Sequence, residues 1–360
     1  MKHDQIVQKV LNFIAADGAT EDAFNRLALD LFKFQFELNE PFRRFALKRG
    51  RTPRTVKLWK EIPAVPIDAF KELTLSCCPP EDASRVFMTS GTTQDEIRGK
   101  SFHSTLSVYD ASMLKTFEKW VMQGLQKINM GILYPSEDVM PNSSLSHYLA
   151  LAFEHFGSSS SQYLMDERNG INFDMLFEEF ERAQTTGVPF ALLGASYSFV
   201  PVLDEMARRN ISFALPAGSR LFDTGGFKGL SRNIEPDEFY GSLSFSLGVP
   251  RRLCINMYGM TELSTQFYDW GNDVCPSVKR GPHWIRTRAI DPLTGEDMPW
   301  GEVGILAHCD LAHFNIVSTI LTEDAGIATD DGFVFLGRTD GVEARGCSMA
   351  VEEFLNATRI

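Results

Sequence analysis

A short hydroxyl-rich segment at residues 87–94, with the sequence FMTSGTTQ, follows an apolar run. Backbone N–H groups and hydroxyls in such a loop suit phosphate oxygens, and glycine lets the loop bend. A serine- and threonine-rich turn is more often an ordinary surface loop, so the segment alone is weak. The chain has no G-x-G-x-x-G fingerprint and no P-loop spacing, which excludes those two phosphate motifs. The candidate phosphate ligands are Thr89, Ser90, Gly91, Thr92 and Thr93.

A second segment, residues 257–262 with the sequence MYGMTE, supplies what an ATP site needs beside a phosphate loop. Tyr258 offers an aromatic face to a base, and Thr261 offers a further hydroxyl. Glu262 offers a carboxylate, which is a ligand that Mg²⁺ prefers. The alternative is a strand end with an incidental glutamate. The two segments together, in this order, favour a site for ATP and magnesium.

A third segment lies near the C-terminus, where residues 321–324 read LTED and residues 332–340 read GFVFLGRTD. Asp324 is able to accept hydrogen bonds from two ribose hydroxyls. Arg338, at the end of an apolar strand, suits a sugar-phosphate. A β-hairpin with a terminal salt bridge would explain the same residues.

The elements that must position these residues follow from hydrophobic periodicity. Residues 4–50 carry apolar positions at helical spacing, and residues 85–89 read as a short buried strand. From about 105 to 257, short apolar runs alternate with helical patterns, which predicts βαβ units and a largely parallel sheet. Ligands then bind at the carboxyl ends of the strands. The predicted strands are 130–134, 190–194, 220–223 and 253–257, and the predicted helices are 106–126, 145–156, 173–185, 198–209 and 235–247.

After residue 275, turn residues separate short apolar runs, which predicts an antiparallel β subdomain. The fold class is therefore α/β, with mixed, largely parallel sheets flanked by helices. We expect three regions along the chain. They are an N-terminal helical segment packed on the core (1–60), an α/β core that contains the first two segments (61–275) and a C-terminal β subdomain (276–360).

Composition narrows the class of protein. The 360 residues carry a net charge of −12, which argues against non-specific binding to nucleic acid or an anionic membrane. No apolar run approaches the length of a membrane span, and the N-terminus lacks an apolar signal core. The six cysteines show no zinc-like spacing and no CxxC pair, so we expect reduced thiols and a cytoplasmic enzyme.

In this order, the three segments resemble the adenylate-forming superfamily of acyl-CoA synthetases, adenylation domains and luciferase-like enzymes. Within it, the chain resembles the LuxE-type acyl-protein synthetases across residues 65–355. The supporting phrases are DAFK at 68–71, LGAS at 193–196, DTGGFKG at 223–229 and RGCS at 345–348. The resemblance implies that Thr89–Thr93 hold the ATP phosphates, with Thr261 at the α-phosphate and Glu262 on Mg²⁺. Around the nucleoside it implies Tyr258 and Gly259 at adenine, Gly225 and Gly226 lining that pocket, Asp324 on the ribose and Arg338 beside it.

The chain also departs from the superfamily pattern. Residues 322–324 read Thr-Glu-Asp where Thr-Gly-Asp is expected, and the sequence ends at Ile360. The small C-terminal domain that carries a catalytic lysine is therefore expected to be missing. Some cation must offset the charge that develops at the α-phosphate. Lys228 and Lys71 are the candidates.

Cys347 is the candidate acyl acceptor, because this family is associated with acyl transfer to a cysteine near the C-terminus. Arg345 would favour its thiolate, whereas Glu343, Glu352 and Glu353 oppose it, and a structural thiol is the alternative. His147 is a candidate substrate residue by resemblance, with a core or capping histidine as the alternative.

The sequence thus predicts an ATP-dependent acid–thiol ligase. It would activate a carboxylic acid, most plausibly a fatty acid, and transfer the acyl group to a protein cysteine or a partner reductase or transferase. One alternative is a stand-alone acyl- or aryl-CoA ligase of the phenylacetate type, which uses coenzyme A directly. Another is a non-catalytic subunit that binds a nucleotide or an acyl group. Chain length, aromatic preference and the partner depend on pocket shape, which no single residue reports.

Overall fold

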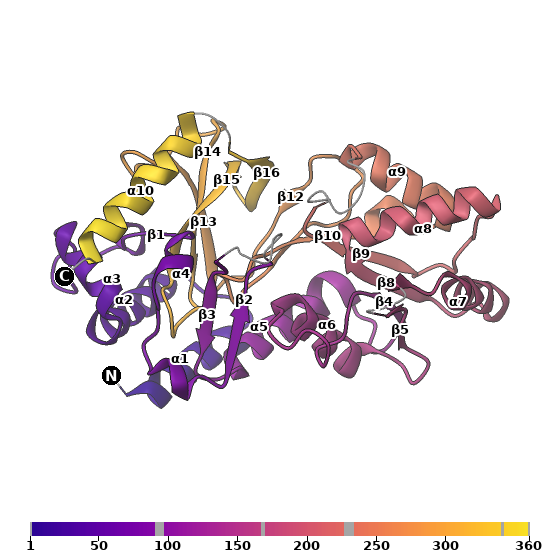
Figure 1. Cartoon of the computed structure of the whole chain (residues 1–360), viewed down its shortest axis with the longest axis horizontal. Helices are drawn as coiled ribbons and strands as arrows, with labels where there is room; N and C mark the ends of the chain where they lie inside the picture. Colours follow the sequence, from indigo (N-terminus) through magenta and orange to yellow (C-terminus); the bar gives the residue numbers. More distant parts are fainter. Residues whose placement is uncertain (1, 91–96, 167–169, 227–233, 340–341, 359–360) are drawn as a thin grey trace.

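The computed structural model of the chain describes residues 2–90, 97–166, 170–226, 234–339 and 342–358. Two sheets organise the molecule, and they lie at opposite ends of its long axis (Figure 1). One is a largely parallel sheet flanked by helices, and the other is a mostly antiparallel sheet packed against the N-terminal helices and the last helix. Backbone hydrogen bonds between Tyr268 and Arg280 link the first sheet to the strand that enters the second.

The parallel sheet has the strand order β11-β10-β9-β8-β4-β5, and only its edge strand β11 runs antiparallel to its neighbour. Helical crossovers join the successive parallel strands, as this geometry requires. The strands are β4 (Asn129–Leu133), β5 (Gln162–Tyr163), β8 (Phe190–Ala195), β9 (Arg220–Thr224), β10 (Cys254–Tyr258) and β11 (Phe267–Tyr268).

Helices cover both faces of this sheet, so its central strands are apolar on both sides. Leu192 of β8 faces a core formed with α7, α8 and α9, whereas Leu193 faces a core formed with α5 and α6. This arrangement explains the unbroken apolar runs in the sequence. The helices are α5 (Ser107–Phe117), α6 (Ser144–Phe156), α7 (Phe173–Thr186), α8 (Ser196–Arg209) and α9 (Pro236–Leu247), and a π-helical turn over Glu118–Met122 extends α5.

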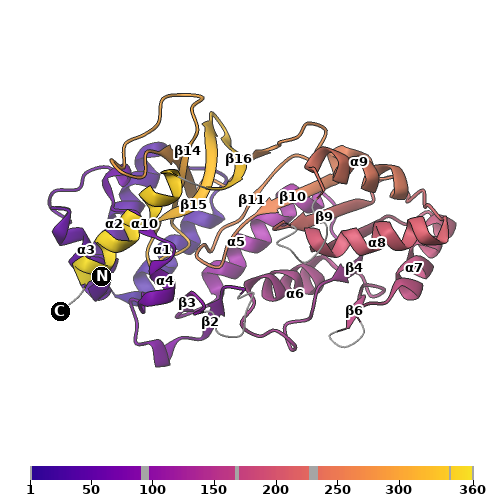
Figure 2. The same ribbon diagram turned by 45° about the horizontal axis from the view of Figure 1, so that its top comes forward.

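The second sheet has the order β12-β16-β15-β14-β13, and β1 pairs with β15 in parallel. Its strands β14, β15 and β16 lie side by side in Figure 2. The long strand β15 is central, and β14 and β16 flank it. The strands are β1 (Val65–Pro66), β12 (Val278–Lys279), β13 (Ile285–Ile290), β14 (Gly304–Asp310), β15 (Thr319–Thr329) and β16 (Gly332–Arg338).

The N-terminal segment is helical, as predicted, and it packs on this second sheet. Thr20 caps α2 by accepting a hydrogen bond from the Ala23 N–H at 3.2 Å, and Gln35 and Asn39 bond to carbonyls of residues 313–316. The buried phenylalanines of the N-terminal helices and the side chains of the second sheet form one hydrophobic core. The helices are α1 (His3–Ala15), α2 (Glu21–Leu38), α3 (Glu40–Lys48) and α4 (Ala69–Glu72), with 3₁₀ turns at Trp59–Glu61, Pro80–Asp82 and Arg251–Leu253.

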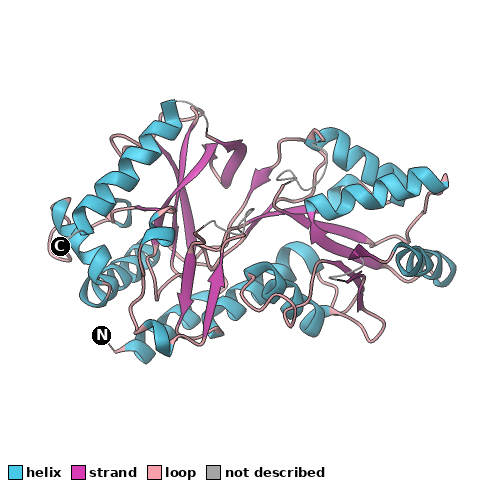
Figure 3. Ribbon diagram, viewed as in Figure 1, coloured by secondary structure: helices cyan, strands magenta, loops and turns pink. Residues whose placement is uncertain are grey.

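The strand before the hydroxyl-rich loop belongs to neither large sheet. β2 (Arg85–Met88) pairs only with β3 (Lys100–His103) in an antiparallel hairpin between the two large sheets (Figure 3). The strand itself was predicted from the sequence. Periodicity reports a buried strand without reporting its partner. A second small hairpin joins β6 (Met165–Asp166) and β7 (Gly170–Ile171).

Two further features were not predicted. The region expected to be a β subdomain, 276–360, ends in a long helix, α10 (Val342–Thr358), and the short strand β1 from the expected α/β core pairs with β15. The helix packs on α3, where Phe354 contacts Phe45 with ring centroids 4.6 Å apart and Glu353 pairs with Arg49 at 2.6 Å. Tertiary docking therefore stabilises a helix whose own pattern is weak.

Candidate active site

The two principal sequence motifs meet at Gly99. The backbone N–H of Gly99 donates to Thr89 Oγ1 at 2.9 Å, and the Thr89 N–H donates to the Gly99 carbonyl at 3.0 Å. A methyl group on Gly99 would lie 3.2 Å from Thr89 Cγ2 and 3.4 Å from Glu262 Oε1. A glycine here therefore allows the glutamate to lie beside the base of the loop. Thr89, at the start of the hydroxyl-rich loop, and Glu262 therefore lie against the same glycine.

The structure describes Thr89 and Ser90 of the hydroxyl-rich loop. Ser90 is exposed directly after Thr89. Gly91, Thr92 and Thr93 lie outside the described residues, so their predicted contacts with phosphate stay predictions. The Thr89 hydroxyl closes the base of the loop as an acceptor, and it still has its own proton to donate.

Glu262 is a buried carboxylate in a site that contains cations. It follows β10 by four residues, in a turn where Thr261 is half-buried. Burial raises the pKa of Glu262 to about 7, and the nearby charges of Arg338 and Lys71 oppose that rise. A carboxylate with such a pKa is held in its neutral form at low pH and is ready to bind a cation at higher pH. Perturbed groups of this kind are typical of functional sites.

Charged side chains from both ends of the chain act on Glu262: Arg338 and Lys71 as cations and Asp68 as an anion. Lys71 of α4 pairs with Asp68 at 2.8 Å, and Arg338 of β16 lies 3.6 Å from Glu323 of β15. The two pairs are in contact through Glu323 and Asp68, which share a side-chain hydrogen bond. Burial, and then the neighbouring Asp68, raise the pKa of Glu323. Lys71 thus joins the site from the N-terminal part of the chain, and Arg338 joins it from the third segment. Asp68 and Glu323 were not among the site residues predicted from the sequence.

Tyr258 and Asp324, which the sequence places at adenine and ribose, are in direct contact. The Tyr258 hydroxyl donates to Asp324 Oδ2 at 2.7 Å, and both side chains are buried. The Tyr258 ring also contacts Phe333 and Phe335, with centroids 5.1 Å and 5.5 Å away. Adenine stacking on Tyr258, and the place of Gly259 beside it, stay predictions. The two predicted nucleoside residues nevertheless share one hydrogen bond.

The glycine pair at the end of β9 lies next to Tyr258. Met257 and Thr224 are paired across β10 and β9, and the Thr224 hydroxyl donates to the Met257 carbonyl at 3.0 Å. Gly225 follows with a positive φ of 78°, a conformation that favours glycine. Gly225 and Gly226 are therefore adjacent to the predicted adenine position. Lys228 lies outside the described residues, so its catalytic role stays a prediction.

A buried aspartate holds this corner of the parallel sheet. Asp223 accepts hydrogen bonds from Ser196 Oγ at 2.6 Å, from the Tyr240 hydroxyl at 3.0 Å and from Asn256 Nδ2 at 2.9 Å. Burial raises the pKa of Asp223 to about 6, and these donors oppose the rise. The network joins the ends of β8, β9 and β10, which positions Gly225 beside Tyr258.

His147 is held between two acids. Its Nε2 lies 2.8 Å from Asp110 Oδ1, and its Nδ1 lies 2.9 Å from Glu137 Oε1. Hydrogen bonds and charge from both acids raise the pKa of His147, although its burial acts in the opposite direction. Its ring packs near Phe87 of β2, with centroids 5.5 Å apart. The role of His147 toward a substrate stays a prediction, and the contacts found support the hairpin that carries the loop.

Cys347 falls within α10, and its side chain lies outside the described residues. The helix contacts α4, which carries Lys71, and β15, which carries Asp324. The helix of the predicted acyl acceptor is therefore packed on two elements of the candidate site.

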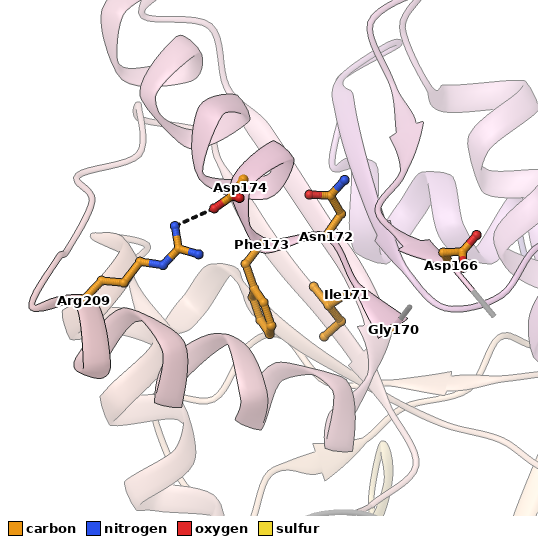
Figure 4. A pocket seen from close by; sticks show the side chains of 7 residues that line it. All are labelled: Asp166, Gly170, Ile171, Asn172, Phe173, Asp174 and Arg209. Carbon is orange, nitrogen blue, oxygen red and sulfur yellow. Dashed lines mark hydrogen bonds and ion pairs between the residues drawn. The ribbon is translucent and has the colours of Figure 1, made fainter. Parts of the chain in front are cut away.

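A separate pocket brings together none of the predicted residues. It lies beside α7 and α8 in the parallel-sheet lobe, where Arg209 pairs with Asp174 at 2.7 Å (Figure 4). Its lining residues are Asp166, Gly170, Ile171, Asn172, Phe173, Asp174 and Arg209. None of the helices in the described part of the chain is long and apolar enough to cross a membrane.

Sequence comparison identifies relatives across nearly the whole chain. Residues 2–356 match the family model described as acyl-protein synthetase, LuxE. The long-chain-fatty-acid–luciferin-component ligase of Vibrio harveyi is 22% identical over 349 residues, which are 92% of this chain and 88% of that protein. The ligase of the same name from Aliivibrio fischeri is 22% identical over 317 residues, which are 85% and 79% of the two chains.

Solved structures share the fold. A 2-hydroxyisobutyryl-CoA ligase in complex with 2-HIB-AMP and CoA aligns with a TM-score of 0.63 at 14% identity, covering 94% of this chain and 69% of that chain. ATP-bound MatB from Rhodopseudomonas palustris aligns with a TM-score of 0.52 at 16% identity, covering 72% of this chain. This chain spans about half, 49%, of the MatB chain. These matches confirm the predicted α/β class and ligase fold, and the chain belongs to the LuxE family of acyl-protein synthetases.

Proposed function

We propose that this protein activates a fatty acid with ATP and passes the acyl group to a thiol. One observation supports this most directly: Thr89 of the hydroxyl loop and Glu262 meet at Gly99, beside Lys71 and Arg338. A phosphate loop, a carboxylate and cations in one place are the requirements for binding a triphosphate. The named relatives from Vibrio and Aliivibrio are long-chain-fatty-acid ligases, which supports a fatty-acid substrate.

The first step forms an acyl-adenylate. A carboxylate oxygen of the acid attacks the α-phosphorus of ATP. The bond from that phosphorus to the oxygen that bridges the α- and β-phosphates breaks, and pyrophosphate leaves with this oxygen. Negative charge accumulates on the α-phosphate as this happens, and fixed cations stabilise it. Among the described residues, Lys71 is the lysine whose charge acts on Glu262, and we assign it to this task. Lys228 remains the second candidate.

Glu262 fits the role of a magnesium ligand. The described residues contain no cluster of three or more histidine, cysteine or acidic side chains arranged for a metal. Mg²⁺ bound with ATP needs only one or two carboxylates, because phosphates and water complete its shell. When bound, Mg²⁺ would neutralise phosphate charge. A buried carboxylate with a raised pKa is well suited to this, because a cation favours its ionised form.

The second step moves the acyl group to sulfur. A thiolate attacks the acyl carbon, a C–S bond forms and AMP leaves with its oxygen. We assign the acceptor to Cys347, and the contacts of α10 with α4 and β15 support this. Coenzyme A is the competing acceptor, since the 2-hydroxyisobutyryl-CoA ligase structure contains it. A partner reductase or transferase would then receive the acyl group.

One experiment tests the function as a whole. ATP–pyrophosphate exchange is measured across saturated acids from C2 to C18 and aryl acids, and the intact protein mass is measured afterwards. We expect exchange with long-chain acids and a mass increase equal to one acyl group. Absence of exchange with every acid, despite ATP binding, would contradict catalysis.

The acceptor is tested in the same assay. The acyl mass should be removed by hydroxylamine and should be absent in Cys347→Ser, while that variant keeps its pyrophosphate exchange. A labile acyl group in Cys347→Ser would rule out this cysteine. AMP release that requires coenzyme A, without acylated protein, would favour the acyl-CoA ligase alternative.

A further inference from the structure

A line of hydrogen bonds runs from Asp324 into the interior of the second sheet. The Tyr258 hydroxyl lies 2.7 Å from Asp324 Oδ2 and 3.4 Å from His308 Nε2. On the other side of the imidazole, Nδ1 lies 2.9 Å from the Thr287 hydroxyl. Thr287 and His308 are paired across β13 and β14. Four strands thus contribute one side chain each.

The protons in this line can be placed by counting. The Tyr258 hydroxyl has a single proton. The short contact shows that the hydroxyl donates this proton in its hydrogen bond to Asp324. Burial, together with the charge of Asp324, raises the pKa of Tyr258, so the hydroxyl stays protonated. Toward His308, the Tyr258 oxygen is then only an acceptor. His308 Nε2 must therefore carry a proton and donate it.

The same counting fixes the other end of the line. Burial lowers the pKa of His308 to about 3, so the ring is neutral and has one N–H. Since Nε2 carries it, Nδ1 is an acceptor and the Thr287 hydroxyl donates to it. Every donor in the line points toward Asp324. If Nδ1 carried the proton instead, Nε2 would compete with Asp324 for the Tyr258 proton.

We propose that Thr287 and His308 are positioning residues for the nucleotide site. The Thr287 hydroxyl donates to His308 Nδ1 and holds the imidazole in place. His308 Nε2–H can then donate to the Tyr258 oxygen, which keeps the Tyr258 hydroxyl directed at Asp324 and fixes that carboxylate for the ribose. This inference rests on the proposed function, because it takes Asp324 as the ribose ligand. Thr287 and His308 themselves touch the nucleotide only through Tyr258 and Asp324.

The surroundings of His308 explain why packing alone would not require a histidine there. Its ring is fully buried beside Phe267 and Phe333, with centroids 5.0 Å and 5.4 Å away. An apolar side chain could fill such a space without the cost of burying two ring nitrogens. What the imidazole adds is a donor on one side and an acceptor on the other.

The test compares Thr287→Val, which removes the hydroxyl at nearly constant shape, with Thr287→Ser, which keeps it. Nitrogen-15 NMR of the full-length protein reports the tautomer of each histidine, and a His308→Gln sample assigns the signal. We expect the Nε2–H form in the wild type and in Thr287→Ser, where a hydroxyl donates to Nδ1, and a changed Nδ1 chemical shift in Thr287→Val, where that donor is lost. In pyrophosphate exchange, Thr287→Val should raise KM for ATP about fivefold with little change in kcat, the effect of losing one oriented hydrogen bond.

Three results would overturn the proposal. An Nδ1–H tautomer in the wild type would reverse the direction of the line. An unchanged KM for ATP in Thr287→Val would show that the line does not act on the nucleotide. Equal losses in Thr287→Val and Thr287→Ser would point to packing. A wild-type KM for ATP in Asp324→Ala would instead contradict the assignment of Asp324 to the ribose, which belongs to the proposed function. The NMR measurement is recorded without ATP, so its result does not depend on that assignment.

Discussion

Replacing Glu262 with glutamine should stabilise the ligand-free protein while abolishing its activity. Glutamine has the shape of the protonated acid but cannot ionise or serve as an anionic metal ligand. The buried carboxylate has a pKa of about 7 instead of the ordinary 4.5. The folded state therefore holds a proton that the unfolded state releases, and stability is lost as pH rises through this window.

The size of the effect follows from that shift. The rise in the pKa of Glu262 from 4.5 to about 7 lowers the free energy of unfolding of the wild type relative to a protein in which this group stays neutral. The loss is about 3 kcal/mol at pH 8 and less than about 1 kcal/mol at pH 5. Glu262→Gln should thus exceed the wild type in free energy of unfolding by about 3 kcal/mol at pH 8. At pH 5 the two proteins should nearly coincide. Asp223 and Asp310, whose pKa values burial raises to about 6, titrate in both proteins and cancel.

Urea unfolding at the two pH values, without ATP or Mg²⁺, measures this difference. Glu302→Gln, which changes an exposed glutamate in a turn, is the matched control and should show no pH-dependent gain. Pyrophosphate exchange by Glu262→Gln should fall at least about a hundredfold. The reasoning is refuted if Glu262→Gln destabilises the protein equally at pH 5 and pH 8.

Substitutions at Lys71 and Lys279 test the electrostatics of the site and of the core that supports it. Lys71→Met should lower pyrophosphate exchange more than about tenfold, because a cation beside Glu262 offsets charge on the α-phosphate. Lys71→Arg keeps a cation there and should retain more of the exchange activity than Lys71→Met. Equal activity of both variants and the wild type would remove Lys71 from catalysis. Lys279→Met should cost about 3–5 kcal/mol of unfolding free energy, because it leaves Asp269, 2.8 Å away and fully buried, without its cation. Thermal unfolding measures this, Lys60→Met at an exposed ion pair is the control, and a loss no larger than that of the control would contradict the prediction.

Much of the fold could be predicted from the sequence because its signals are local. The strands β4, β8, β9 and β10 and the helices between them were predicted to within a few residues, since a doubly covered parallel sheet produces unbroken apolar runs. The nucleotide motifs also stand at the ends of recognisable runs. The sequence therefore determined the α/β class, the family and the approximate place of Tyr258, Glu262 and Asp324.

Long-range pairing decided the rest. The parallel pairing of β1 with β15 and the docking of α10 on α3 join segments far apart in the chain, and periodicity does not report such partners. Gly99 shows the consequence for the site. In the sequence it is one more glycine, and only the folded chain brings it against both Thr89 and Glu262.

The electrostatics likewise depend on tertiary structure. Nothing in the local sequence marks Glu262 as a carboxylate with a raised pKa, because the shift comes from burial, and the opposing charge of Lys71 lies nearly two hundred residues away. The sequence shows His308 only as a polar residue in a mostly apolar strand, whereas the fold places Thr287 and Tyr258 on its two nitrogens. The sequence determined which chemical groups this protein has, and the fold decided which of them meet and in which protonation state.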